Sequence, residues 1–221
     1  MQTVGSLIAG AVGGVLIFLL IEFIRRYLLV PRLTLTCKPG GKGFTPEARV
    51  PGTFTKEGGP EVRARYLRVA VENKSRFTKA SAKSCRAYLT DIKRLDSKGS
   101  ATETSFAETL RLRWAYEGPD GELHGGIDIP AGVTLYFDVV SSQEAVTCGD
   151  KHDPEKLILE VAAKDAREAP ELINLLSRNS SYRLSVMVTA EGINPVKAEV
   201  DVTLGERWND IGPYEGGSKG R

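Results

Sequence analysis

The sequence predicts a mainly β protein, in which an N-terminal transmembrane helix precedes an antiparallel β-sandwich with one short helix. Residues 4–21 carry no charged side chain, and about 20 apolar residues cover the hydrocarbon core of a bilayer. Beyond residue 31, apolar and polar residues alternate with period two in several short segments, as in strands with one buried face. We therefore divide the chain into an anchor with its basic flank at 1–30, a sandwich at 31–208 and a flexible tail at 209–221.

The apolar run is predicted to be an anchor rather than a cleaved signal peptide. Only three uncharged residues precede it, so the basic n-region of a signal peptide is missing, and the run is longer than a typical signal core. Arg25, Arg26 and Arg32 follow as a basic membrane flank. Because Lys and Arg near a spanning helix stay on the cytoplasmic side, the sandwich is expected to be cytoplasmic and the protein a single-pass protein of the inner (plasma) membrane.

Small residues repeat every four positions inside the run, at Ser6, Gly10 and Gly14. This spacing lets two helices approach closely in lipid. We therefore expect a helix-association face there, with a second copy or another membrane protein as the partner. The lipid bilayer itself is the other expected partner.

Eight segments of the remaining chain have the composition of strands. In residues 84–92, for example, Cys85, Ala87 and Leu89 alternate with Arg86 and Tyr88. The predicted strands are 32–36, 66–71, 84–92, 109–116, 134–140, 156–162, 182–189 and 196–204. Turn sequences such as Gly118-Pro119-Asp120-Gly121 separate them, which favours an antiparallel sandwich.

One helical pattern interrupts the strands. Residues 169–176 place Leu172, Leu175 and Leu176 on one helical face. This spacing predicts a short crossover helix that caps the sandwich.

A block of the predicted sandwich resembles immunoglobulin-like domains of prokaryotic surface and membrane proteins. It comprises residues 66–73, Ala80 and residues 84–89, and the later residues 127–132, Ile-Asp-Ile-Pro-Ala-Gly, are similar to a turn that precedes another strand in those modules. The resemblance implies an immunoglobulin-like fold over about residues 31–204 and implies no activity, since such sandwiches have many unrelated functions.

The three cysteines are Cys37, Cys85 and Cys148, with no Cys-x-x-Cys pair. Neither a full disulfide framework nor a zinc knuckle follows from this set. Cys85 and Cys148 have a separation that suits an inter-sheet disulfide in an outward-facing domain. The alternative is that Cys85, on an apolar strand face, is a buried free thiol.

Catalytic signals are weak, and we expect no enzyme, no cofactor and no metal. His124 and His152 lie in predicted loops, with Asp150 and Asp153 as the nearest acids, and no phosphate-binding or nucleophile motif is found. The charges nearly balance, with a formal net charge of +2, so no global basic field points to nucleic acid.

Basic residues do gather between positions 63 and 94, where they form a locally positive stretch. Phosphate binding would need these cations free on one surface, whereas strands with one buried face commonly carry Lys and Arg on the other. The members are Arg63, Arg65, Arg68, Lys74, Arg76, Lys79, Lys83, Arg86, Lys93 and Arg94.

These features predict a non-catalytic interaction or scaffold module in a membrane-associated complex. Two alternatives remain open at this level. One is an extracytoplasmic domain that binds a ligand or an envelope component, and the other is a hydrolase or metal enzyme with an unfamiliar site.

Overall fold

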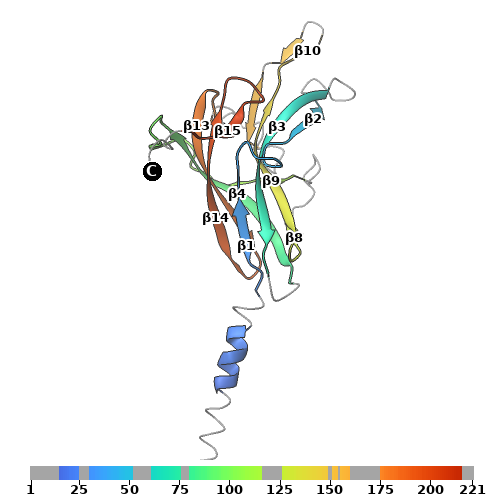
Figure 1. The fold of residues 1–221 in the computed structure, drawn as a ribbon, viewed down its shortest axis with the longest axis vertical. Coiled ribbons are helices and arrows are strands. Elements are labelled where there is room, and N and C mark those ends of the chain that lie inside the picture. Colours follow the sequence, from blue (N-terminus) through green and yellow to red (C-terminus); the bar gives the residue numbers. More distant parts are fainter. Residues whose placement is uncertain are drawn as a thin grey trace, which may run out of the picture.

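The computed structural model describes residues 15–24, 30–51, 61–75, 80–115, 126–148, 151–153, 155–159 and 175–215. Residues 15–24 form the N-terminal helix, at one end of the molecule (Figure 1). Within the described ranges, no helix combines the length and the apolar character needed to cross a membrane. Residues 4–14 of the predicted spanning run lie outside these ranges.

The strands form two antiparallel sheets and a separate hairpin. The six-stranded sheet has the order β1-β3-β9-β12, with β2 beside β3 and β7 beside β9. Its strands are β1 (Leu33–Thr36), β2 (Glu47–Pro51), β3 (Glu61–Asn73), β7 (Arg113–Trp114), β9 (Thr134–Gln143) and β12 (Lys156–Leu159).

The seven-stranded sheet has the order β15-β14-β13-β4-β5, and β6 and β8 also pair with β4. Its strands are β4 (Ala82–Leu95), β5 (Ala101–Glu103), β6 (Leu110–Arg111), β8 (Ile127–Ile129), β13 (Ser180–Ala190), β14 (Ile193–Leu204) and β15 (Ile211–Pro213). β10 (Val146–Cys148) and β11 (Lys151–Asp153) form the hairpin. Because β15 pairs with the end of β14, the sheet extends beyond the boundary predicted at residue 208.

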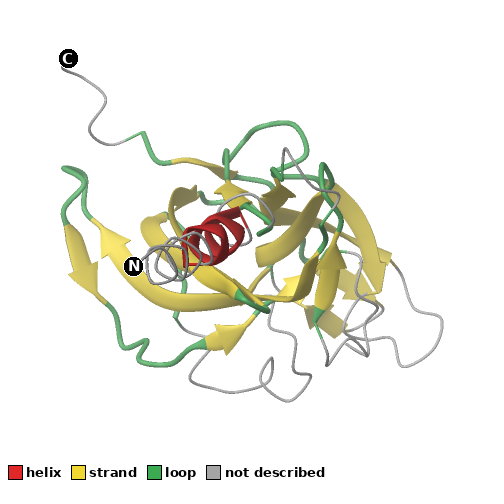
Figure 2. Cartoon of the chain, turned by 90° about the horizontal axis from the view of Figure 1, so that it is seen from below, coloured by secondary structure: helices red, strands yellow, loops and turns green. Residues whose placement is uncertain are grey.

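One hydrophobic core lies between the two sheets, and the sandwich architecture is thereby confirmed. Figure 2 shows the strands around it, with the helix seen nearly end-on. The buried alternation follows the predicted period: Cys85, Ala87 and Leu89 of β4 have no exposed surface. In the opposite sheet Trp114 packs edge to face on Phe137, with ring centroids 5.8 Å apart.

β9 is buried along most of its length, and an extra residue interrupts its pairing with β3. Leu67 pairs with Val140 and Arg68 with Asp138, so Val139 is the bulged residue. A bulge bends its strand and re-aims the side chains around it. Phe137, Val139 and Val140 are all fully buried as a result of this local geometry and of the strands on both sides.

Two predicted elements differ from the structure. The predicted strand 109–116 is two short strands in different sheets, because the chain crosses between the sheets at the fully buried Leu112. The predicted helix 169–176 lies outside the described residues up to position 174, and its last two residues, Leu175 and Leu176, are not helical. Leu176 packs in the core instead.

A buried amide at the end of β3 joins three segments. Asn73 has no exposed surface, and its Nδ2 donates to the carbonyl oxygens of Ala80 at 2.9 Å and Ile129 at 3.0 Å. The backbone N–H of Asn73 donates to the Val133 carbonyl, and the Asn73 carbonyl accepts from Gly132. One residue therefore fixes β3 to the start of β4 and to the β8–β9 turn.

We expect Asn73→Ala to lower the free energy of unfolding by about 2–4 kcal/mol, because it leaves two carbonyl oxygens at a buried site without their donor. The measurement is urea unfolding of the full chain in detergent, followed by tryptophan fluorescence. Asn194→Ala, at an exposed position of β14, is the control and should change stability by less than about 0.5 kcal/mol. Equal unfolding midpoints for the two variants contradict this account.

Gly126 precedes β8 with φ +89°, and a Cβ there would lie 2.7 Å from the carbonyl carbon of Ser84. Gly192, in the β13–β14 turn, has φ +67° and no atom within 4 Å of a Cβ. Both alanine variants carry the cost of a left-handed backbone, about 1–2 kcal/mol. We expect Gly126→Ala to cost at least about 2 kcal/mol more than Gly192→Ala in the same unfolding assay, because only the first also forces backbone apart. Similar costs at both sites would show that the contact with Ser84 is relieved easily.

Candidate functional site

The N-terminal helix exposes apolar side chains on every face. In residues 15–24 the exposed fraction of the large apolar residues ranges from 37% at Ile24 to 66% at Phe18. They are Val15, Leu16, Ile17, Phe18, Leu19, Leu20, Ile21, Phe23 and Ile24. A helix that is apolar all round is normally enclosed by protein or lipid. Removing these side chains from water is worth on the order of 10 kcal/mol.

The residues predicted to associate helices, Ser6, Gly10 and Gly14, lie outside the described residues, as do Arg25 and Arg26 of the basic flank. That association face therefore stays a prediction. Arg32 is described and exposed, directly before β1, and its carbonyl oxygen accepts the N–H of Lys74 at 2.8 Å. This hydrogen bond joins the residue before β1 to the residue that follows β3.

Most described cations of the basic stretch 63–94 are engaged by partners. Arg63 pairs with Glu144 at 2.9 Å, Lys83 with Asp128, and Lys93 with Glu103 at 2.8 Å. The remaining partners are Asn209 and Glu47 for Arg65, Asp138 for Arg68, Glu72 for Lys74 and Ser180 for Arg94. Arg76 and Lys79 lie outside the described residues. The stretch as a whole is not the free cationic surface that phosphate binding needs, and Arg86 is the exception among its described members.

The pair between Arg68 and Asp138 is the most enclosed of these contacts. Arg68 Nε donates to Asp138 Oδ1 at 2.7 Å, and the side chain of Asp138 is only 3% exposed. The Arg68 guanidinium also lies 5.6 Å from the ring centroid of Tyr66. An enclosed charge that loses its partner is strongly destabilising, so this pair has a structural role on the outer face of the six-stranded sheet.

The start of β3 and the connection between β14 and β15 lie at the end of the sandwich far from the helix (Figure 1). The Arg63 guanidinium of β3 lies 5.1 Å from the ring centroid of Trp208, in the β14–β15 connection. Arg65 donates to the backbone oxygen of Asn209 in the same connection. These contacts close the core at this end and leave Trp208 almost completely buried.

Cys85 is a buried free thiol, and its Sγ lies 3.5 Å from the carbonyl oxygen of Ala82. Cys148 belongs to β10, and its side chain is outside the described part of the chain. Figure 1 places β10 at the opposite end of the sandwich from β8, the strand that pairs with Cys85. A disulfide needs Cα atoms within about 7 Å, so the structure does not bring the predicted pair together.

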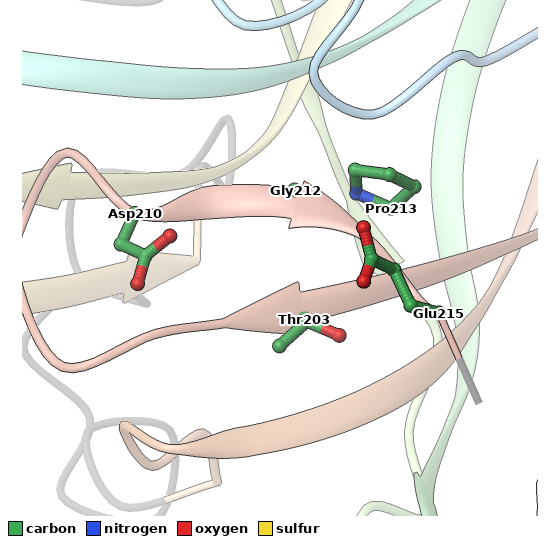
Figure 3. A pocket seen from close by; sticks show the side chains of 5 residues that line it. All are labelled: Thr203, Asp210, Gly212, Pro213 and Glu215. Atoms are coloured by element: carbon green, nitrogen blue, oxygen red, sulfur yellow. The ribbon is translucent and has the colours of Figure 1, made fainter.

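A shallow hollow of about 320 Å³ lies along β14 and β15 (Figure 3). Thr203, Asp210, Gly212, Pro213 and Glu215 line it. The carboxyl groups of Asp210 and Glu215 stand at its two ends, with the Thr203 hydroxyl between them. Two separated acids and one hydroxyl make this surface polar. A catalytic site would also need a base, a nucleophile and anion-binding donors that converge on one point, and these residues do not form such an arrangement.

His124 lies outside the described residues, and His152 is described only in its backbone, within β11. Among the side chains that the structure describes, no group of three or more His, Cys, Asp or Glu residues could hold a metal ion. The hypothesis of a histidine site with converging acids therefore gains no geometric support here.

Comparison of the chain with protein-family models, with curated proteins and with solved structures gives no significant match. The resemblance to immunoglobulin-like membrane domains accordingly stays a prediction.

Sequence reasoning identified the exposed apolar segment and the cations, but not which cations are paired. The acid that pairs with Arg68, Asp138, is 70 positions away in the sequence, and the acid that pairs with Arg63, Glu144, is 81 positions away. At such separations the sequence around a cation does not indicate which acid it contacts. The one available signal was the strand pattern, which indicates the face of each cation but not its neighbour on the next strand.

We expect both described thiols to react slowly with iodoacetamide in the folded chain at pH 8. Burial raises the pKa of Cys37 to about 12, and burial together with the charge of Asp128 raises the pKa of Cys85 to about 11. Only the thiolate reacts. Because both values are raised, their contribution to stability is complete below the ordinary thiol pKa of about 8.5 and declines as pH rises toward these values.

The measurement is mass spectrometry of peptides after labelling with and without urea, under non-reducing conditions. Urea should make both cysteines react rapidly, which also serves as the control for reagent activity. Recovery of Cys85 linked to Cys148 in the native protein contradicts the free-thiol arrangement and supports an outward-facing domain.

Proposed function

We propose that this protein is a single-pass membrane protein whose N-terminal helix holds the β-sandwich at the cytoplasmic face of the inner (plasma) membrane. There the sandwich acts as a non-catalytic interaction or scaffold module. The observation that carries the proposal is the helix of residues 15–24, whose apolar side chains are exposed on every face. Lipid is the environment that such a surface fits.

The sequence before this helix supports the same proposal. Residues 4–14 continue the uncharged run, so that a helix over the whole segment would reach the length of a bilayer core. Arg25, Arg26 and Arg32 follow it, which favours the cytoplasmic side for the sandwich. The repeat of Ser6, Gly10 and Gly14 suits association with a second helix in the same membrane.

An interaction role agrees with the properties of the sandwich. Its core and its Arg63–Trp208 closure make a rigid support, and the loops and edges of such a sandwich can bind partners. A free thiol at Cys85 agrees better with the cytoplasm than with an oxidising compartment. The extracytoplasmic alternative depended on the pairing of this cysteine.

We expect Val15→Arg combined with Leu16→Arg to remove the chain from carbonate-washed membranes, because each arginine near the centre of a spanning helix costs about 2.5–3.5 kcal/mol of insertion. The matched control, Val15→Ala with Leu16→Ala, keeps the segment apolar and should remain in the membrane fraction. Sedimentation of wild type and both variants, followed by immunoblotting, is the measurement. A wild-type chain found in the soluble fraction overturns the proposed anchor.

The side of the membrane is tested with Lys98→Cys, since Lys98 is exposed in the turn between β4 and β5. For a cytoplasmic sandwich, an impermeant maleimide should label the introduced thiol only after the membrane is opened. Labelling on intact cells places the sandwich outside and overturns the proposed orientation.

A further inference from the structure

The outer face of the seven-stranded sheet divides into two halves with different charge. In the half farther from the helix, the register sets Glu103, Lys93, Arg183 and Asp201 in one row across four strands. Arg183 makes two 2.8 Å hydrogen bonds to Asp201, and Lys93 lies 2.8 Å from Glu103. Asp91 and Glu199 also lie beside these two cations. Four carboxylates therefore satisfy the two cations of this half.

The half nearer the helix carries two cations, Arg86 and Lys197, that contact no acid among the described residues. Here the register sets Arg111, Tyr88, Met187 and Lys197 in one row across β6, β4, β13 and β14. Arg86 lies on β4 two residues before Tyr88, and it pairs with Thr189 of β13. Their neighbours along the strands, such as Ala87 and Val186, are buried in the core, so these side chains lie on the outer face. We name Arg86, Tyr88, Arg111, Met187 and Lys197 the basic row.

Among the described residues, Arg86 and Lys197 of the basic row have no ion-pair or side-chain hydrogen-bond partner. Lys197 is exposed, and neither it nor Arg86 contacts an acid in the described part of the chain, in contrast to Lys93 and Arg183. The Nε of Arg86 is buried without a hydrogen-bond acceptor, counting described residues only. Donors that are already shielded from water gain most from an added acceptor.

The composition of the basic row is that of an interface centre. Tyr, Met and Arg are the residue types enriched at the centre of protein interfaces. Tyr88 and Met187 are half-buried and lie side by side between the cations, so they form an apolar floor. Three strand spacings separate the ends of the row, about 14 Å, which an extended segment of four or five residues spans.

We propose that the basic row is the docking surface for an acidic segment of a different protein, with carboxylates on Arg86 and Lys197 and an apolar side chain on Tyr88 and Met187. The inference rests on the proposed function and names the chemistry of its partner. Opposite charge is the reason for the choice, since the row contains cations and no carboxylate.

A second copy of this chain does not fit the same surface. Two copies anchored in one bilayer are related by a two-fold axis along the membrane normal, so the same height of each sheet would meet. Cations would then face cations. The acidic half of a second copy could reach the basic row only if that copy were inverted, with its helix pointing away from the membrane.

The test uses the purified full-length chain in detergent and a fluorescein-labelled peptide, Glu-Glu-Leu-Glu-Glu, with its Gln-for-Glu analogue as the uncharged probe. We expect saturable binding of the acidic peptide by fluorescence anisotropy and none of the analogue. Arg86→Ser with Lys197→Ser should weaken binding about tenfold or more, a loss of about 1.4 kcal/mol or more, since it removes both charged contacts to the peptide. Lys98→Ser, which removes an exposed cation from the acidic half of the same sheet, should leave affinity unchanged.

Two results overturn the proposal. One is equal affinity of the double variant and of Lys98→Ser, and the other is displacement of the peptide by phosphatidylserine vesicles at matched charge, which assigns the row to lipid headgroups. In native membranes, a photoreactive residue replacing Met187 should cross-link to another protein, and the double variant should abolish that cross-link. If the chain sediments with membranes but cross-links only from photoreactive residues on other faces, the docking role of the basic row is refuted and the proposed function stands. If the chain is absent from membranes, the proposed function itself is refuted.

Discussion

The arrangement of the two sheets depends on the buried amide of Asn73. A sandwich needs its sheets held in one relative position, and apolar contacts alone set that position loosely because they have no direction. The two hydrogen bonds from Asn73 Nδ2, to Ala80 and Ile129, do have direction. They connect β3 of one sheet to the residues just before β4 and to the end of β8 in the other sheet. The contact lies at the end of the sandwich nearest the helix (Figure 1). The core residues then pack between surfaces whose register is already set.

The opposite end is closed by different chemistry. There Arg63 and Arg65 of β3 reach the β14–β15 connection through the ring of Trp208 and the backbone of Asn209. By the alternation of side chains along a strand, Arg63 and Arg65 lie on the same face of β3 as the core residue Leu67. The same strand thus uses a neutral amide at one end and guanidinium groups at the other, and its centre supplies Leu67, Val69 and Val71 to the core.

The alternation of apolar and polar residues was enough to predict the long strands, but it did not predict how they are connected. The alternation in β4 and β13 is visible in the sequence because one face of each strand is buried and the other is not. β5 and β10, with three residues each, are too short to show a period, and the crossing at Leu112 looks like a continuous strand because its buried side chain continues the apolar pattern. The basic row was hidden for another reason: Arg86 and Met187 are about a hundred residues apart, and only the pairing of β4 with β13 makes them neighbours.

The attachment of β1 has a mechanical consequence. Only eight residues separate Ile24, the last described residue of the helix, from Leu33, and β1 then runs antiparallel to the last four residues of β3. A pull on the helix acts along β1, while the bonds of an antiparallel ladder lie across it. The ladder is therefore loaded in shear, so its bonds resist together instead of opening one after another. A force on the helix is therefore passed into the sandwich as a whole, and the short strand β1, with four residues, carries that load.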